Sequence, residues 1–237
     1  MTGPGPRPLL DGLLPGAAVV AERFRDPPEP QLFPQEAALV EAAVEKRQRE
    51  FATVRTCARE ALARLGIPPV PILPLGGAAS PFGRRAPRWP SGIVGSMTHC
   101  DGYRGAALAR SAALASVGVD AESHLPLPAR VTAAIATPEE SESLGALREA
   151  EPAIAWERIL FSAKESVYKA LFPLTGHPLG FHDCTITLCV DGNFAARVQA
   201  GLRRPQDDQG LSGRWRLRQG ESNGRPALIG TALAVPI

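Results

Sequence analysis

Apolar residues recur at three- and four-residue steps in the first third of the chain. The series consists of Phe51, Val54, Ala58, Leu62 and Leu65. Residues spaced in this way share one face of a helix. Pro34 lies just before the region, and proline is favoured in the first turn of a helix. The pattern therefore predicts a long helix over 35–65 that packs this stripe against a core.

Three short strand-like runs follow a loop-rich stretch over 68–90. They are GIVGSMTH (92–99), GAALAR (105–110) and ALASVGVDAE (113–122). The connections between them are short, whereas parallel strands need a long crossover. We therefore expect these strands to pair antiparallel.

The second half of the chain repeats this rhythm, with helices first and strands afterwards. Thr137, Pro138 and Glu140 form the signal of a helix start, in which threonine and glutamate cap each other. A second helix is predicted over 152–172, ended by Pro173. The strand-like runs that follow are CTITLCV, FAARVQA, RWRLRQ and ALIGTALAV.

The repeated order predicts an α+β protein of two similar lobes. Each lobe would be a small, mostly antiparallel sheet packed with helices, and a ligand cleft would lie at the seam. We place the N-terminal lobe at 1–112 and the C-terminal lobe at 113–237. Residues 1–8, MTGPGPRP, are expected to be disordered.

Composition limits the function classes. The chain has 237 residues and a net charge of +2, so a broad nucleic-acid-binding face is not expected. The stretch LLDGLLPGAAVVA is interrupted by Asp11 and Pro15 and is too short to span a membrane. The cysteines have neither CxxC spacing nor the density of a disulfide framework. We therefore expect a cytoplasmic protein; its cysteines are Cys57, Cys100, Cys184 and Cys189.

Asp120 and Glu122 lie in the predicted strand SVGVDAE. Because side chains alternate along a strand, the two carboxylates point to the same face, with Cα atoms about 6.6 Å apart. Carboxylates that point together repel unless a cation lies between them. Oxygen ligands without a nearby cysteine or histidine favour Mg²⁺ over Zn²⁺. The alternative is a solvated pair at a strand end.

Glu165 and Lys169 are four residues apart in FSAKESVYKAL (161–171) and share one helix face, with Lys164 about 100° away. The neighbours of these residues are largely apolar, so little of this helix is free to face water. Together with the strand carboxylates, these residues indicate a metal and an anionic substrate. The alternative is an exposed ion pair of small energy.

His99 stands out among the four histidines by its context. It lies at a strand end in GSMTHCDGY (95–103), between small residues and a turn. The remaining histidines, His124, His177 and His182, are interpreted as structural.

VGSMTHCDGY, SVGVDAE and WERILFSAKESVYKAL occur in this order and resemble the three motifs of the phosphopantetheinyl transferases of the surfactin and enterobactin type. The similarity is closest to bacterial members that serve siderophore, polyketide, non-ribosomal peptide or lipid synthesis. The resemblance implies an enzyme that transfers the 4′-phosphopantetheine arm of coenzyme A to a serine of an acyl or peptidyl carrier protein, which leaves adenosine 3′,5′-bisphosphate. It also implies a pseudo-two-fold pair of α+β lobes with coenzyme A and Mg²⁺ in the seam.

The resemblance assigns the metal and the catalytic roles mainly to the C-terminal lobe. Asp120, Glu122 and Glu165 would be metal ligands, and Mn²⁺ could replace Mg²⁺. Glu165 would act as the base toward the carrier serine or only as a ligand. Lys169 would support the leaving phosphate, and Lys164 would bind the pyrophosphate.

The resemblance assigns contacts with the phosphate and adenosine end of coenzyme A to the N-terminal lobe. His99, Arg47 and Arg55 would reach the 3′-phosphate, Arg84 would lie near the adenosine, and Ser96 and Thr98 would add hydroxyl contacts. Arginine suits phosphate because its planar fork matches the oxygens. The surface for an acidic carrier would involve Leu125, Leu127, Arg130 and Val131, or these residues would merely anchor a loop.

Two other functions remain as alternatives to a monomeric transferase. A non-catalytic protein could bind coenzyme A or a carrier on the same fold, but every acid and lysine of the motifs is present. A metal-dependent nuclease could also use such acids. Ser123 and His124 follow Glu122, however, so the lysine expected in that motif is missing.

Overall fold

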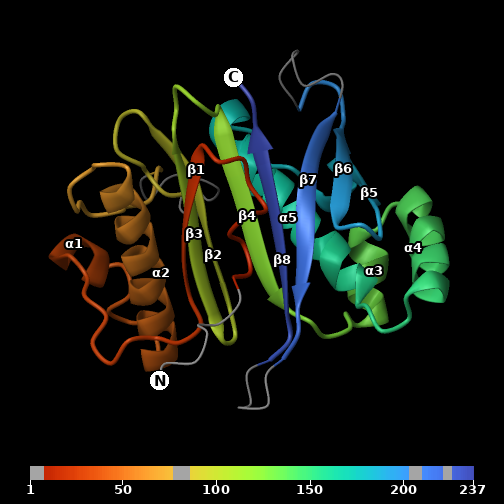
Figure 1. Ribbon diagram of the computed structural model, residues 1–237, viewed down its shortest axis with the longest axis horizontal. Helices are drawn as coiled ribbons and strands as arrows, with labels where there is room; N and C mark the ends of the chain where they lie inside the picture. Colours follow the sequence, from red (N-terminus) through yellow and green to blue (C-terminus); the bar gives the residue numbers. More distant parts are fainter. Residues whose placement is uncertain (1–7, 77–85, 203–209, 221–225) are drawn as a thin grey trace.

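The computed structural model describes residues 8–76, 86–202, 210–220 and 226–237, and these form two antiparallel sheets side by side (Figure 1). The first sheet has the order β1-β3-β2 and the second the order β4-β8-β7-β6-β5. The strands are β1 (Ala18–Arg23), β2 (Ile93–Cys100), β3 (Tyr103–Arg110), β4 (Ser116–Ser123), β5 (Cys184–Leu188), β6 (Asn193–Val198), β7 (Leu211–Arg218) and β8 (Leu228–Val235). The predicted α+β fold of two lobes is confirmed.

Helices cover both sheets. They are α1 (Pro34–Ala37), α2 (Glu45–Arg64), α3 (Ala129–Ile135), α4 (Pro138–Ala150) and α5 (Trp156–Thr175), with a short 3₁₀ turn, η1 (Phe181–Asp183). Helix α2 packs on the first sheet through Cys57, Ala58 and Leu62, which are buried against strand residues such as Leu108. Helix α5 packs on the second sheet and supplies much of its core.

The predicted single helix over 35–65 is wrong in its first third. The chain forms the short α1, leaves helical geometry over 38–44 and begins α2 at Glu45. Glu36 of α1 is fully buried, and its carboxylate ties α1 to the rest of the lobe by accepting hydrogen bonds from Arg59 and from the backbone N–H of Ile72. These partners lie far along the chain, so local periodicity could not reveal them.

Two other elements differ from the sequence prediction. Strand β1 was not predicted, and it pairs along its whole length with β3, which lies more than 80 residues later. Helix α5 continues through Pro173 and ends at Gly176, which has a left-handed conformation with φ of 67°. Pro173 has no N–H to donate within the helix, and the last residue of the helix lies two positions after it.

The start of α4 agrees with the prediction. The backbone N–H of Glu140 donates to the Thr137 hydroxyl at 3.2 Å, and that of Thr137 donates to the Glu140 carboxylate at 2.7 Å. This reciprocal cap depends on four consecutive residues, so the sequence alone was enough to predict it.

The two sheets meet where β2 and β4 run side by side. Two side chains of β2 bridge this junction: Ser96 Oγ accepts from the N–H of Val119 at 3.2 Å, and Thr98 Oγ1 accepts from the N–H of Ala121 at 3.0 Å. An apolar cluster shared by both sheets lies beneath; it includes Tyr103, Ala107, Val117, Val119, Leu228 and Ala232. The seam is therefore part of the protein core.

An N-terminal segment, residues 8–14, crosses from one sheet to the other. Glu22 of β1 accepts hydrogen bonds from the N–H groups of Leu9 and Leu10, and Arg216 of β7 donates to the carbonyl of Asp11. Leu9 and Leu10 are fully buried in the shared cluster. The predicted disorder over 1–8 falls almost entirely on residues outside the described ones.

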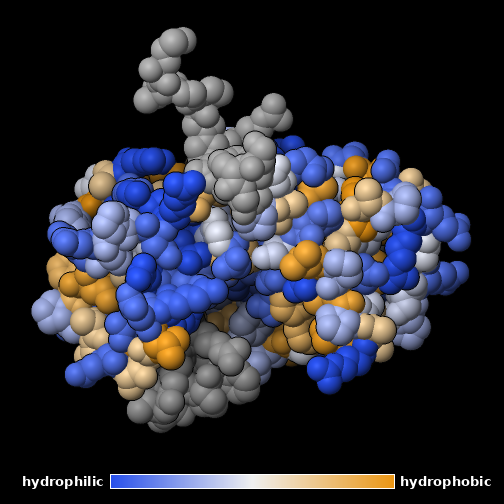
Figure 2. Space-filling model, turned by 90° about the horizontal axis from the view of Figure 1, so that it is seen from below, coloured by the Kyte–Doolittle hydropathy of each residue, from blue (hydrophilic) through white to orange (hydrophobic). Residues whose placement is uncertain are grey.

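One end of the molecule has an uneven distribution of polar groups. In the view from below, hydrophilic side chains gather over the first lobe, and a hollow lies between it and the more mixed surface of the second lobe (Figure 2). The strand β4 ends toward this side of the molecule (Figure 1).

Candidate active site

Asp120 and Glu122 lie on the same face of β4, as their alternation predicted. Asp120 is buried, and Glu122 lies partly exposed near the end of the strand. Between them Ala121 points to the opposite side, into the shared core. The strand therefore holds two acidic groups next to the seam.

One face of α5 lies over these carboxylates. Arg158, Ser162, Glu165 and Lys169 follow one another at steps of four, three and four residues, which places them on a single helix face. Ser162 Oγ donates to Asp120 Oδ2 at 2.8 Å, and Lys169 Nζ donates to Asp120 Oδ1 at 2.6 Å. At the other end, Arg158 donates to Glu122 Oε2 at 3.1 Å.

The close approach of α5 to β4 requires a glycine. A Cβ atom at Gly118 would lie 1.9 Å from the carbonyl oxygen of Ser166 and 2.8 Å from the backbone nitrogen of Ala170. A real Cβ atom does not fit at such distances. Gly118 therefore lets the helix backbone rest on the strand backbone, which brings the Arg158–Lys169 face within reach of Asp120.

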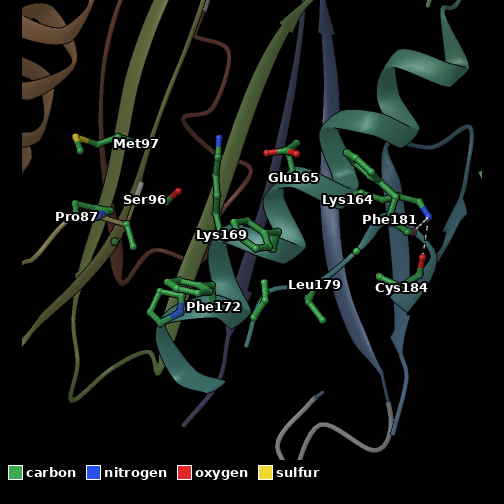
Figure 3. A pocket seen from close by; sticks show the side chains of 16 residues that line it. Pro87, Ser96, Met97, Lys164, Glu165, Lys169, Phe172, Leu179, Phe181 and Cys184 are labelled. Carbon is green, nitrogen blue, oxygen red and sulfur yellow. Dashed lines mark hydrogen bonds between the residues drawn. The ribbon is translucent and has the colours of Figure 1, made fainter. Parts of the chain in front are cut away.

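A cavity of about 510 Å³ opens beside this face. Glu165 and Lys169 point into it from α5 (Figure 3), and β2 contributes Ser96 and Met97 to its lining. Its walls are mostly apolar; they include Pro87, Tyr168, Phe172, Leu179 and Phe181. The cavity therefore combines an apolar interior with a carboxylate and an ammonium group.

Burial, together with nearby charges, shifts the pKa values of Glu122 and His99. Burial, and then the negative charge of Asp120, raise the pKa of Glu122 to about 7, although Arg158 and Lys169 act in the opposite direction. Burial, followed by the positive charges of Arg47 and Lys169, lowers the pKa of His99 to about 4. His99 is therefore neutral at pH 7 and can accept a hydrogen bond.

His99 and Arg47 lie together, as the resemblance implied. The guanidinium of Arg47 donates to Nε2 of His99, and the carboxylate of Glu50 lies 3.6 Å from the same nitrogen. The side chain of Arg47 is about half exposed. This pair forms a polar group of the first lobe at the seam.

Arg55 is not part of this exposed pair. Its side chain is 9% exposed; its Nε donates to the carbonyl of Ile72 at 3.2 Å and lies 3.6 Å from the carboxylate of Glu36. Burial lowers its pKa to about 10. In this structure Arg55 helps to hold the first lobe together, and its expected contact with coenzyme A stays a prediction. Arg84 lies outside the described residues.

Lys164 points away from Glu165 and Lys169 (Figure 3). Its side chain is 2% exposed, and its Nζ lies 2.8 Å from Glu140 Oε2 and 2.8 Å from the carbonyl of Cys184. A third acceptor is the carbonyl of Phe181. Contact with a pyrophosphate, the role implied by the resemblance, would require this ammonium to leave these acceptors.

Ser96 and Thr98 lie at the seam, where their hydroxyl oxygens accept from the backbone of β4. Thr98 also donates to Asp120 Oδ1 at 3.1 Å, so it orients that carboxylate. The structure therefore gives both hydroxyls a role between strands, and their expected contacts with coenzyme A stay a prediction.

Sequence reasoning missed Arg158 and Ser162, which contact the two strand carboxylates directly. Their spacing relative to Glu165 and Lys169 matches a single helix face and could have pointed to them. His124 was interpreted as structural, and its Nε2 accepts a hydrogen bond from the N–H of Ala155 at the start of α5.

The donor set suits a hard divalent cation. In the described parts of the chain, no three histidine, cysteine, aspartate or glutamate side chains lie close enough together to hold a metal as they stand. The ammonium of Lys169 already lies against Asp120 Oδ1, where a positive charge is favoured. Mg²⁺ is commonly bound by one or two carboxylates, with substrate phosphates and waters completing its shell. The carboxylates of β4 fit such a partial site.

No helix in the described ranges is long and apolar enough to cross a lipid bilayer.

Comparisons with known proteins cover both lobes. Residues 35–109 match the model of the 4′-phosphopantetheinyl transferase N-terminal domain, and residues 116–228 match that of the 4′-phosphopantetheinyl transferase superfamily. The chain is 48% identical to the 4′-phosphopantetheinyl transferase Svp of Streptomyces mobaraensis over 96% of this chain and 89% of that protein. It is 45% identical to PptT of Mycobacterium tuberculosis over 84% of this chain and 87% of the relative. It is 42% identical to Npt of Nocardia iowensis over 79% and 80%.

Proposed function

The chain belongs to the 4′-phosphopantetheinyl transferase superfamily, and we propose that its reaction takes place at the seam, on the face shared by β4 and α5. It is an enzyme that transfers the phosphopantetheine arm of coenzyme A to carrier proteins. One observation carries the proposed location: Lys169 and Ser162 hold Asp120 while Glu165, from the same helix face, points into the cavity.

Members of this family generally use a divalent metal ion, and we propose Mg²⁺, with Mn²⁺ as a substitute. Asp120, Glu122 and Glu165 would hold it. When bound, the ion would neutralise charge that develops on the pyrophosphate of coenzyme A. The same-face carboxylates of β4 support the assignment of the first two ligands. The assignment of Glu165 depends on the resemblance and on its position in the cavity.

The proposed chemistry is a displacement at phosphorus. The hydroxyl oxygen of the carrier serine attacks the phosphorus that carries the pantetheine arm. Its proton passes to Glu165, directly or through a water, because a serine hydroxyl is a weak nucleophile at neutral pH. The bond from that phosphorus to the remaining phosphate breaks, and adenosine 3′,5′-bisphosphate leaves. Lys169 donates a proton to the leaving phosphate or stabilises its charge.

The cavity beside Glu165 and Lys169 suits the pantetheine arm. Ligand sites of this kind are mostly apolar, with a few polar groups that orient the ligand. Its largely apolar walls, with charged groups gathered at Lys164, Glu165 and Lys169, match an arm whose charge is concentrated at the phosphate end. His99 and Arg47 would then contact the phosphate groups at the adenosine end.

The proposed site draws its residues from one chain, which supports a monomer. Leu125 is 61% exposed in the loop after β4 and would belong to the surface that receives the carrier, with Leu127, Arg130 and Val131. A cytoplasmic location stays a prediction.

Intact-mass spectrometry of apo carrier proteins tests the proposed residues. The wild-type enzyme, Glu165→Gln and Glu157→Gln are each incubated with coenzyme A, Mg²⁺ and a panel of carriers, with EDTA in a parallel series. We expect one phosphopantetheine to be added by the wild type and by Glu157→Gln, because the carboxylate of Glu157 pairs with Arg148 of α4 and not with a residue of the proposed site. We expect addition to be lost with Glu165→Gln and with EDTA.

Other outcomes would change particular parts of the proposal. Full activity of Glu165→Gln would move the base to another group. Full activity in EDTA would remove the metal. Tight binding of coenzyme A without modification of any carrier would favour a non-catalytic binding protein instead.

A further inference from the structure

We propose that Arg158 is a positioning residue that fixes the carboxylate of Glu122 for binding of a divalent cation. This inference rests on the proposed metal site. Sequence patterns did not single out this arginine, and the mechanism described above does not use it.

All three nitrogens of the Arg158 guanidinium donate hydrogen bonds. Nη1 donates to Glu122 Oε2 at 3.1 Å, Nε to the carbonyl of Leu125 at 3.0 Å, and Nη2 to the carbonyl of Pro126 at 3.3 Å. The group is planar, so three acceptors in different directions leave it little freedom to turn. It therefore presents a fixed donor to one oxygen of Glu122.

The first turn of α5, which carries Arg158, is itself held in place by a hydrogen bond. Arg158 lies in the first turn of α5, and the preceding Ala155 donates its N–H to His124 Nε2 at 3.0 Å. His124 follows directly after β4. The helix start and the end of the strand are thus linked twice, by the imidazole of His124 and by the guanidinium of Arg158.

The contact with Arg158 involves only one of the two carboxylate oxygens of Glu122. Oε2 accepts from Arg158, whereas Oε1 accepts no hydrogen bond from any residue that the structure describes. Glu122 is a partly exposed side chain at a strand end, with a second carboxylate on the same face. Without Arg158 it would be free to rotate away from that negative charge. Groups that orient metal ligands commonly change metal affinity by 10–100-fold.

A neighbouring, more exposed ion pair serves for comparison with the Arg158–Glu122 pair. Arg148 of α4 pairs with Glu157 of α5, but the Arg148 side chain is 46% exposed, compared with 19% for Arg158. Exposed pairs contribute little to stability. Arg148→Ala therefore removes a neighbouring arginine, whose partner Glu157 lies in the first turn of α5, without touching Glu122, and it serves as the matched control.

Binding of Mn²⁺ without coenzyme A is measured by electron paramagnetic resonance, which detects the free hexaaqua ion. The proteins are the wild type, Arg158→Ala, Arg158→Lys, Arg148→Ala, Glu122→Gln and Glu122→Gln/Arg158→Ala, each with its thermal melting curve. We expect Arg158→Ala to weaken Mn²⁺ binding by roughly 10-fold. We expect Arg158→Lys to be weakened almost as much, because lysine keeps the charge but loses the fork. Arg148→Ala should bind like the wild type.

The double variant tests whether Arg158 acts through Glu122. Adding Arg158→Ala to Glu122→Gln should cause no further loss, because the carboxylate to be oriented is already absent. A further 10-fold loss would show that Arg158 acts elsewhere and would overturn the inference. Wild-type affinity in Arg158→Ala, or full recovery with Arg158→Lys, would also overturn it.

Steady-state kinetics give a second readout. The Arg158 variants should need more metal for half-maximal rate, while KM for coenzyme A at saturating metal stays within about twofold of the wild type. If Arg158→Ala melts at too low a temperature to assay, Arg158→Lys and Arg158→Gln are compared with the wild type in its place. A wild type that binds no Mn²⁺, either alone or with coenzyme A present, would refute the metal site itself, whereas normal binding in both wild type and variants would refute the role of Arg158 alone.

Discussion

At the scale of single residues, Lys164 and Glu165 are adjacent in the sequence but have different surroundings. The ammonium group of Lys164 is surrounded by oxygen acceptors of α4, β5 and η1, whereas Glu165 points into the cavity. The partner of Lys164, Glu140, caps the start of α4 and also accepts from the N–H of Ile186 in β5 at 2.6 Å. One buried ion pair therefore joins α4, α5 and β5. Breaking such a pair leaves an uncompensated buried charge.

Lys164→Met should lower the free energy of unfolding by about 3–5 kcal/mol, because Glu140 would lose its buried counter-ion. Urea unfolding followed by far-UV circular dichroism measures this change. Arg197→Met is the control, since Arg197 pairs with Glu139 on the exposed side of α4. Unchanged stability of Lys164→Met together with a raised KM for coenzyme A would instead support the pyrophosphate role implied by the resemblance.

His99 should make stability depend on pH between about 4 and 6.5. Its pKa is about 4 in the folded protein, whereas an unfolded histidine has a pKa of about 6.5. The unfolded chain therefore binds a proton first as the pH falls, so the contribution is present above pH 6.5 and is lost toward pH 4. His99→Gln should flatten the fall in melting temperature between pH 6.5 and 4.5; an unchanged slope would contradict the assignment.

Several candidate residues could be predicted from the sequence because their geometry is local. The alternation of β4 set Asp120 and Glu122 on one face, and the helical period set Glu165 beside Lys169. The burial and the ion pairs of Lys164 and Arg55 could not be predicted, because their partners Glu140 and Glu36 are distant in the sequence and are brought close only by the fold. Their catalytic and binding roles stay predictions.

At the scale of elements, the position of α5 on β4 depends on one residue without a side chain. Gly118 permits backbone contact between the helix and the strand. A helix held farther away would also carry Ser162 and Lys169 away from Asp120. Packing and site geometry are therefore set by the same contact.

Gly118→Ala should destabilise the protein by about 3 kcal/mol and sharply reduce its activity, because overpacking forces backbone shifts. Gly145→Ala in α4 is the control: a Cβ there meets nothing within 4 Å, and alanine favours helix, so stability should rise by about 0.5–1 kcal/mol. Chemical denaturation and the carrier-modification rate measure both effects. Wild-type stability of Gly118→Ala would show that α5 can move outward without cost.

Elements differed in how well the sequence predicted them. The cap of α4 was predictable because its donors and acceptors lie within four residues. Strand β1 was not, because its pairing with β3 joins distant parts of the chain. The predicted end of α5 at Pro173 was wrong, because the helix continues until Gly176 adopts a left-handed conformation.

At the scale of the whole molecule, the two lobes share one apolar cluster and one crossing segment. Leu9 and Leu10 lie in that cluster with residues of both sheets. A change in this segment is therefore expected to affect both lobes together.

Leu9→Ala should lower the free energy of unfolding by roughly 3 kcal/mol, because it leaves a cavity in a fully buried site. Differential scanning calorimetry should show a single transition in both the wild type and the variant, since the lobes unfold together. Leu125→Ala, at an exposed position, should change stability by less than about 0.5 kcal/mol. Two separate transitions would mean that the lobes are independent.

The hydroxyl links between β2 and β4 also limit how this protein can be recombined. The chain passes from the first sheet to the second between Arg110 and Ser116, which would be a convenient crossover point for chimeras with related transferases. In a chimera joined there, the hydroxyls of Ser96 and Thr98 from one parent would have to accept hydrogen bonds from β4 of the other. Leu9 from the first parent would also need a glycine at the position of Gly230, where a side chain would collide with it. The two lobes therefore depend on each other's residues at the junction, and shuffling libraries should take both sides of the junction from the same parent.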